Sequence, residues 1–325
     1  MKNYTVRLYN DTDFNLWNEF ITKAKNATFL FHRNFMEYHK DRFDDYSMMV
    51  FCNDKLVSVI PANRVEDRVY SHQGLTYGGF VLDKKIKLGD VIEIAKTVVK
   101  FLFDNKISKF QLKLIPSIYN DYFSEEIEYC MFLMQSKLIR RDCLSVIDLK
   151  SNYLVSKTRK ECIRKGIRNK VIIKEENNFE KFWSEILIPN IKLKHNSSPV
   201  HSVDEIAMLQ KLFPQNIRHF NAYFNDEIVA GSTIFVTNKV AHPQYISGNS
   251  KKNEIGSLDI LYHHLITNVF KEKAYFDFGP SHENEGRNIN NGILFWKESF
   301  GAKTTVQDFY EVETSNYKLL ENVLI

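Results

Sequence analysis

The order of structural elements is clearest in the stretch from Tyr275 to Val312, YFDFGPSHENEGRNINNGILFWKESFGAKTTVQDFYEV. It opens with aromatic side chains, and Gly279-Pro280 ends the run, so the sequence predicts a β-strand there. The segment 281–291 that follows is rich in Asn, Glu and Gly. Because this segment has no core to bury, we expect it to be held by partners or to be mobile.

A short helix is predicted next, from Gly292 to Phe300. Lys297 lies beside its apolar set, which consists of Ile293, Leu294, Trp296 and Phe300. Gly301 occupies the position typical of a glycine after a helix C-terminus, and 306–312 is predicted as a final strand. This order frames a binding site, because the loop supplies donors and acceptors and the helix supplies one lysine among aromatic side chains.

Two motifs in this stretch resemble the closing signature of Fem-like acyltransferases of the GNAT superfamily. They are Phe276-Asp277-Phe278-Gly279 and Trp296-Lys297-Glu298-Ser299-Phe300-Gly301-Ala302. That group includes aminoacyltransferases that build peptidoglycan cross-bridges and acetyltransferase-like proteins from polysaccharide gene clusters. The resemblance implies an α/β (α+β) protein of two tandem GNAT-like domains, each with a mixed, mostly antiparallel sheet flanked by helices.

An internal repeat supports two domains. Asn53-Asp54 and Asn225-Asp226 are tight turns between strand-like runs, 172 residues apart. Each predicted hairpin leads to a long strand, an amphipathic helix and another strand, at 71–81, 88–103 and 109–115 and again at 242–247, 255–270 and 275–278. A repeat this long indicates a duplicated domain. We therefore expect an N-terminal domain at 1–150 and a C-terminal domain at 151–325.

The remaining elements are predicted from local patterns. Helices are expected at 13–24, 125–138, 179–191 and 202–213, strands at 46–52, 56–61 and 144–149, and an aromatic, basic helix at 28–43. The chain has 325 residues, 44% of them hydrophobic and 14% aromatic, which suffices for globular cores. Its net charge of +4 permits anionic substrates but does not demand nucleic acid.

The four cysteines match no zinc-ligand spacing, and we expect reduced thiols and no metal site. The N-terminal residues MKNYTVRLYND lack the apolar segment of a signal peptide. No apolar run approaches the roughly 20 residues needed to span a bilayer. The sequence therefore predicts a cytoplasmic protein with at most peripheral membrane contact.

Residues 157–174, KTRKECIRKGIRNKVIIK, hold eight basic residues and one acid, Glu161. In a helix, Lys160, Arg164 and Arg168 would share one stripe with no acid between them. Like charges so placed repel, and a phosphate-bearing partner would relieve the cost. The alternative is a solvated basic face.

The candidate catalytic residues are Lys297 and Asp277. Lys297 matches the lysine of the family motif and could hold a phosphate or polarise a carbonyl; the alternative is a surface lysine. Asp277, at the end of a strand, could orient an amine or act as a base, or else cap the loop at Ser281. The candidate substrate contacts are Tyr245, Ser247, Ser281, Arg287 and Asn291 in the second half, and Arg33, His72, Gln73 and Tyr77 in the first.

The acyl donor is left open between acyl-CoA (acetyl-CoA) and aminoacyl-tRNA. GNAT domains typically bind the CoA pyrophosphate on a glycine-rich turn at a helix N-terminus, which neither half shows. The helix starts at 83–89 and 250–256 instead carry lysines and one glycine each, and Lys251 and Lys252 are candidate phosphate contacts. The charged coiled-coil arms typical of relatives that use tRNA are absent, which disfavours tRNA.

Three functions follow as hypotheses. The first is an N-acyltransferase that acts on an amine of a cell-envelope or polysaccharide precursor, such as an amino sugar or a peptide stem. The second is a catalytically silent GNAT-like binding module in envelope polysaccharide assembly. The third, a nucleic-acid binder, rests only on 157–174 and is disfavoured by the mild net charge, and no DNA partner is expected.

Overall fold

The computed structural model describes residues 2–324 and divides the chain into two compact units. Unit 1 comprises Met1–Asp142 together with Val306–Ile325, and unit 2 comprises Cys143–Thr305. The end of the chain joins unit 1 because β17 (Lys303–Glu313) pairs antiparallel with β8 (Lys109–Lys113). The sequence had placed the division at residue 150 and the whole C-terminus in the second domain.

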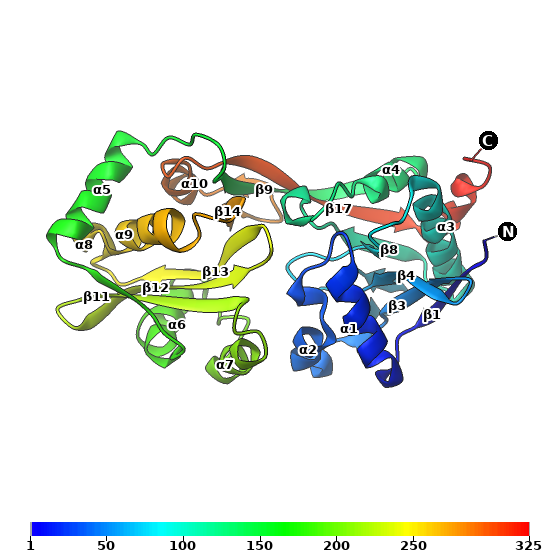
Figure 1. The fold of residues 1–325 in the computed structure, drawn as a ribbon, viewed down its shortest axis with the longest axis horizontal. Coiled ribbons are helices and arrows are strands. Elements are labelled where there is room, and N and C mark those ends of the chain that lie inside the picture. Colours follow the sequence, from blue (N-terminus) through cyan, green and yellow to red (C-terminus); the bar gives the residue numbers. More distant parts are fainter. Residues whose placement is uncertain (1, 325) are drawn as a thin grey trace. The chain divides into compact units, whose positions relative to one another are not determined.

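Unit 1 contains two strand systems (Figure 1). One has the order β1-β3-β4-β7, namely Tyr4–Leu8, Met48–Cys52, Lys55–Ile60 and Val81–Leu82. The other runs β17-β8-β6-β5-β2, in which β6 is Arg68–Tyr70, β5 is Asn63–Val65 and β2 is Asp44–Asp45. The helices are α1 (Phe14–Lys23), α2 (Arg33–Met36), α3 (Leu88–Asp104) and α4 (Glu126–Leu133), with 3-10 turns at 11–13, 29–31, 37–42, 117–119 and 314–320.

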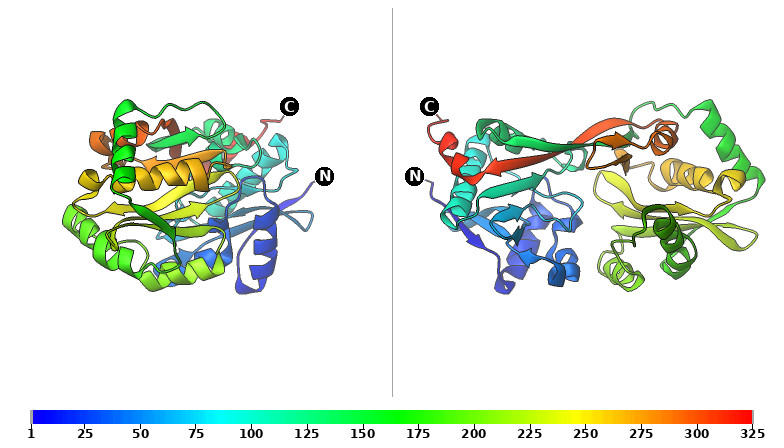
Figure 2. Two further views of the ribbon diagram at one scale, coloured as in Figure 1. Left: turned by 60° about the vertical axis from the view of Figure 1, so that its left-hand side comes forward. Right: turned by 180° about the vertical axis from the view of Figure 1, so that it is seen from behind.

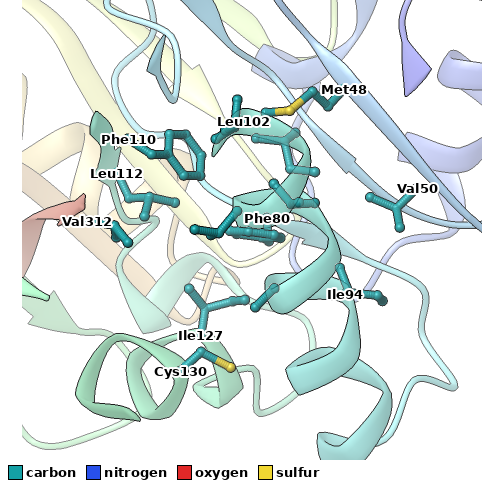
Figure 3. Packing of buried hydrophobic residues seen from close by; sticks show 14 of the residues in the cluster. Met48, Val50, Phe80, Ile94, Leu102, Phe110, Leu112, Ile127, Cys130 and Val312 are labelled. Carbon is teal, nitrogen blue, oxygen red and sulfur yellow. The ribbon is translucent and has the colours of Figure 1, made fainter. Parts of the chain in front are cut away.

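The core of unit 1 forms where α3 packs against the strands (Figure 3). Ile94 and Leu102 of α3 and Phe110 of β8 belong to one cluster, and all three are fully buried. Val312 of β17 belongs to the same cluster. Burial of an aliphatic or aromatic side chain contributes about 1.5–3 kcal/mol to stability. The last strand therefore stabilises unit 1 through this core as well as through its pairing with β8.

Unit 2 has the strand order β10-β11-β12-β13-β14-β9, of which β9 begins in unit 1 and continues into unit 2 at Cys143. These strands are Ile172–Glu175, Ile217–Phe224, Glu227–Val236, Val240–Gly248, Tyr275–Pro280 and Lys137–Asp148, and a small hairpin joins β15 (His282–Glu283) to β16 (Asn288–Ile289). The helices are α5 (Lys157–Arg168), α6 (Ile188–His195), α7 (Val203–Leu212), α8 (Lys252–Ile255), α9 (Ser257–His264) and α10 (Asn291–Glu298), with π-helical turns η5 (Phe182–Leu187) and η6 (Leu265–Val269).

The helices of unit 2 cover both faces of its sheet. α9 lies over β11–β13 on one face, and α6 lies on the other (Figure 1). Figure 2 shows the same layering from two further directions. The predicted fold class, mixed and mostly antiparallel sheets flanked by helices, is confirmed for each unit.

The predicted repeat is also confirmed at its two turns. Asn53 and Asp54 have φ values of 46° and 67°, and Asn225 and Asp226 have 49° and 63°. Two successive left-handed residues are the geometry that matches the twist of a two-residue hairpin, and Asn and Asp tolerate it best among residues with a Cβ.

Several predicted elements differ in detail from the structure. Residues 28–43 do not form one helix but a series of short helical turns, and 71–81 is a loop with a strand only at its end. The helix expected at 255–270 is present at 257–269, as α9 and η6, and it begins only after Gly256, which adopts φ 77°. The polar segment 281–291 contains the short β15–β16 hairpin. Within residues 2–324, no helix combines the length and the apolar composition needed to cross a bilayer.

Candidate functional site

The site is built around the end of the parallel pair β13–β14. The two strands pair only at Val240↔Tyr275 and Ala241↔Phe276. One residue further on, the His242 ring Nδ1 donates to the carbonyl oxygen of Asp277 at 2.9 Å. Beyond this point β13 continues against β12 as far as Gly248, while β14 stays paired with β9. The strands thus part at their carboxyl ends, which is where ligands bind in many α/β sheets.

Lys297 of α10 points into this region and is only 4% exposed. Its Nζ donates to the carbonyl oxygens of Gly279 at 2.9 Å and Pro280 at 2.5 Å. Burial lowers its pKa to about 8, and the nearby Asp277 carboxylate acts in the opposite direction. A lysine held by two carbonyls at the end of β14 is not the surface lysine that the sequence left as an alternative.

Asp277 lies beside the same turn and is also buried. Its Oδ1 accepts a hydrogen bond from the Gly279 backbone N–H at 2.7 Å, and its Oδ2 lies 3.4 Å from His242 Nδ1. Gly279 has φ 71°, a conformation that glycine adopts at little cost. The structure therefore brings the two candidate catalytic residues together around one turn, which Asp277 shapes and Lys297 holds.

A buried polar network next to this turn was missed by the sequence analysis. Arg159, at the start of α5, is ion-paired with Asp259 of α9, and both side chains are 7% exposed. Arg159 Nε donates to Ser299 Oγ at 2.8 Å, and the Trp296 indole N–H donates to Asp259 Oδ1 at 3.1 Å. Two residues of the closing motif therefore act as anchors for α10. No sequence signal distinguished Arg159 from the seven other basic residues around it.

The other candidate contacts of unit 2 differ in their surroundings. Tyr245 is buried and hydrogen-bonded to His201 at 2.6 Å, and Ser247 accepts from Asn190 Nδ2 at 2.8 Å. Ser281 is buried, and its hydroxyl makes no hydrogen bond with the described residues. The side chains of Arg287 and Asn291 are exposed.

The candidates of unit 1 lie in an aromatic and ionic cluster. Arg33 is buried, pairs with Glu37 and Asp45, and lies over the Tyr9 ring. His72, at φ 66°, stacks on His39 with ring centres 5.1 Å apart, and burial lowers its pKa to about 3. Tyr77 Oη donates to Thr28 Oγ1 at 3.0 Å, whereas Gln73 is exposed and bonded to Asn63. These contacts give Arg33 and Tyr77 well-defined packing roles.

The basic stripe on α5 differs from the prediction in one respect. Lys160, Arg164 and Arg168 are exposed, but Glu161 pairs with Arg164 at 3.4 Å and with Arg168 at 3.1 Å. The expectation of a stripe without an acid was wrong, because Glu161 is three residues from Arg164 and seven from Arg168 and therefore reaches both from the same face. Glu161 thus relieves much of the repulsion among the basic side chains of α5, and this repulsion was the reason to expect a phosphate-bearing partner.

Lys251 and Lys252 lie at the start of α8. The Lys251 backbone N–H is already used by Asn249 Oδ1 at 3.1 Å. α8 has four residues and ends at Gly256. Any phosphate contact of these lysines would therefore come from their side chains rather than from a helix N-terminus.

Comparison with known proteins identifies the fold. No protein-family model matches the sequence, and neither does any curated protein. Among solved structures, FemX superposes with a TM-score of 0.66 at 10% identity, covering 98% of this chain and 100% of FemX. L-PGS from Bacillus licheniformis gives 0.54 at 10% identity, over 89% of this chain and 94% of that one.

A third similar structure is a tandem GNAT protein from the clavulanic acid biosynthesis pathway. Its TM-score is 0.50 at 8% identity, with 97% of this chain and 99% of the other covered. The alignments with FemX and with this protein span nearly the whole chain. The protein therefore has the same fold as FemX and as the tandem GNAT protein, over nearly its whole length.

Proposed function

We propose that the protein is an N-acyltransferase that moves an acetyl or aminoacyl group onto an amine of a cell-envelope or polysaccharide precursor. The observation that carries this proposal is the buried Lys297 ammonium, held at the point where β13 and β14 part. An ammonium has three N–H donors, and two of them are used by Gly279 and Pro280. The third remains for a substrate oxygen.

The reaction requires a donor for negative charge on oxygen. The amine nitrogen attacks the acyl carbonyl carbon of a thioester or ester, and the carbonyl oxygen becomes an oxyanion. The C–S or C–O bond to the carrier then breaks, the amine loses a proton, and the leaving group takes one up. A preorganised donor at the oxyanion typically contributes 100- to 1,000-fold to turnover. Lys297, with a pKa of about 8, is mostly charged at pH 7 and can serve as that donor.

Asp277 has a positioning role in this proposal. Its Oδ1 is used by the Gly279 backbone N–H, so it fixes the two carbonyls that hold Lys297. Its negative charge also favours the protonated lysine. The role of general base is not assigned to Asp277, because the residue is 1% exposed and already bonded.

The similar structures support acyl transfer as a class and leave the donor open. The tandem GNAT protein is described in relation to AcCoA. We propose acyl-CoA as the first donor to test and aminoacyl-tRNA as the second. The acceptor, an amino sugar or a peptide stem with a free amine, is proposed from the resemblance to Fem-like proteins.

The test is acetyl transfer from radiolabelled acetyl-CoA to glucosamine and to a lysine-containing stem peptide. Lys297→Met should lower kcat by about 100-fold or more, while the melting temperature changes by a few degrees. Lys303→Met, which removes an exposed lysine, should leave turnover unchanged. Full turnover by a folded Lys297→Met variant would refute the proposed role. If acetyl-CoA gives no product with the wild-type protein, the same variants are assayed with aminoacyl-tRNA.

A catalytically silent binding module is the second candidate. It is favoured by the helix starts at 83–89 and 250–256, which lack the glycine-rich pyrophosphate turn of GNAT domains. Such a module would bind an amine-bearing precursor and yield no product with either donor. Saturable precursor binding without turnover would support it.

A further inference from the structure

Unit 2 contains a polar pocket away from Lys297. Its volume is about 450 Å³, and its lining consists of Glu176, Asn177, Asn178, Lys181, Asn221 and Tyr223. Small-molecule sites typically measure about 300–1,000 Å³. Residues 176–181 connect β10 to η5, and the other two lining residues lie on β11. β11 and β14 are three strand spacings apart in the sheet, or about 14 Å, so this pocket is distinct from the turn at Gly279.

A chain of hydrogen bonds leads from the buried His219 to the lining of the pocket. His219 is 1% exposed, and its ring bonds Thr233 Oγ1 through Nδ1 and Asn221 Oδ1 through Nε2, both at 3.0 Å. Asn221 Nδ2 then donates to Glu176 Oε2 at 2.8 Å, and Tyr223 Oη donates to the same oxygen at 2.8 Å. Burial lowers the pKa of His219 to about 4, so the chain is neutral up to its last member, Glu176.

The position of Asn221 in this network depends on Gly231 of the neighbouring strand β12. A Cβ on Gly231 would lie 2.4 Å from Phe182 Cδ2 and 2.7 Å from Asn221 Oδ1. A glycine on β12 is therefore required for Asn221 and the aromatic side chain of η5 to approach the strand together. Buried polar networks are costly unless every member is bonded, and here the bonding fixes one carboxylate oxygen at the pocket.

The donors and acceptors of the lining that the network does not use determine which ligands the pocket can bind. Among the described residues, Glu176 Oε1 accepts no hydrogen bond and Lys181 makes no ion pair. Asn177 and Asn178 use their side-chain oxygens within the protein, and their amide N–H groups remain as donors. The lining therefore offers one strong acceptor and several donors, and its two formal charges cancel.

We propose that this pocket binds a neutral sugar ring through neighbouring hydroxyl groups. A hydroxyl both donates and accepts, so adjacent hydroxyls can donate to Glu176 Oε1 and accept from the Asn178 amide and Lys181 at the same time. An apolar ligand would displace water from these groups without replacing its hydrogen bonds, which disfavours such a ligand. A charged ligand would meet no compensating net charge. Sugar binding here requires no transfer chemistry, so it stands independently of the proposed function.

The test is saturation-transfer NMR on the full chain with N-acetyl-D-glucosamine and D-glucose as probes, in the absence of any acyl donor. Single sugars should bind with Kd near 1 mM or weaker, about −4 kcal/mol. Glu176→Gln should weaken binding at least about tenfold, the loss expected when a charged hydrogen-bond acceptor is neutralised. The matched control is Glu175→Gln, because Glu175 is the adjacent acid and pairs with Arg218 at 2.6 Å outside the pocket.

Lys181→Met is a second test variant, and it is not expected to disturb folding because Lys181 is exposed. It should also weaken binding, while the melting temperature stays unchanged. Sodium acetate and L-lysine serve as charged probes. The proposal is overturned if neither sugar binds saturably up to about 50 mM, if Glu176→Gln and Lys181→Met bind as the wild-type protein does, or if a charged probe binds more tightly than both sugars.

Discussion

Arg159 and Asp259 form a buried ion pair that links the first turn of α5 to the first turn of α9. The same carboxylate accepts the indole N–H of Trp296, and the same guanidinium bonds the hydroxyl of Ser299. The guanidinium also lies 5.1 Å from the centre of the Phe300 ring. The helix that carries Lys297 is therefore held in place by the basic segment, through a residue that faces the core rather than solvent.

Removing one partner of this pair should destabilise unit 2. Arg159→Met or Asp259→Leu leaves a buried charge unpaired, and each should lower the free energy of unfolding by about 3–5 kcal/mol. The double variant should lose less than the sum of the two, because neither charge remains. Urea denaturation measures all three. Arg168→Met, in an exposed pair, is the control and should change stability by less than about 0.5 kcal/mol; strictly additive losses would show that the pair does not act as a unit.

The buried Lys297 should make stability depend on alkaline pH. Its pKa is about 8 in the folded protein and 10.5 ordinarily, so the folded state binds fewer protons between these values and the free energy of unfolding rises with pH. The difference corresponds to roughly 3 kcal/mol. Denaturation of the wild-type protein and Lys297→Met at pH 7, 8, 9 and 10 should show the wild-type protein gaining relative to the variant. The free energy of unfolding of Lys303→Met should change with pH as that of the wild-type protein does. A difference between the wild-type protein and Lys297→Met that stays constant with pH would contradict the burial of the ammonium.

Glu128 of α4, in unit 1, should make the free energy of unfolding fall as pH rises, which is opposite to the effect of Lys297. Burial, with smaller contributions from Glu125, Glu126 and Asp308, raises its pKa to about 7. The folded state then binds more protons than the unfolded state between about pH 4.5 and 7, so stability falls as pH rises through this range. Glu128→Gln should remove that fall.

Thermal melts from pH 4.5 to 8 measure this effect, with the exposed Glu66→Gln as the matched control. Glu66→Gln should keep the pH dependence of the wild-type protein. If Glu128→Gln keeps it as well, the fall in stability has another source.

Two helix glycines should respond oppositely to alanine. On Gly166 of α5, a Cβ would lie 2.6 Å from Ile260 Cγ2 and 2.8 Å from the backbone oxygen of Gly256. The backbone cannot yield readily, so Gly166→Ala should cost about 1–3 kcal/mol. On Gly89 of α3 the nearest atom would be 3.6 Å away, and Gly89→Ala should stabilise by up to about 1 kcal/mol. Equal effects on the midpoint of urea unfolding would show that Gly166 of α5 is not in close contact with Ile260 of α9.

Local patterns predicted much of the architecture. The Asn-Asp turns at 53–54 and 225–226, the amphipathic helix 88–103 and the aromatic strand that ends at Gly279 are all present. Each depends on side chains within a few residues of one another, and hydrophobic period and turn chemistry report such short-range preferences directly. The order of these elements, together with the closing motif, sufficed to indicate two GNAT-like domains.

Local patterns misjudged elements whose conformation depends on distant contacts. The helix start at Lys252 ends at Gly256 because that glycine takes a left-handed conformation, where a Cβ would meet the backbone oxygen of Cys162 at 2.6 Å. Likewise, Ile293 was expected in the apolar face of α10 but is 45% exposed, whereas Lys297 is buried. Lys297 faces inward because its ammonium donates hydrogen bonds to the backbone carbonyls of Gly279 and Pro280.

The repeat, the two hairpins and the closing motif that ends in Ala302 can be read from the amino-acid sequence, since they follow from local preference and spacing. Three features arise only on folding: β17 completes unit 1, Arg159 faces inward, and Glu176 lies at the end of a hydrogen-bonded chain from the buried His219. These features join residues 43 to about 200 positions apart in the chain. Their free energy comes from burial and pairing in three dimensions, which no local pattern of residues encodes.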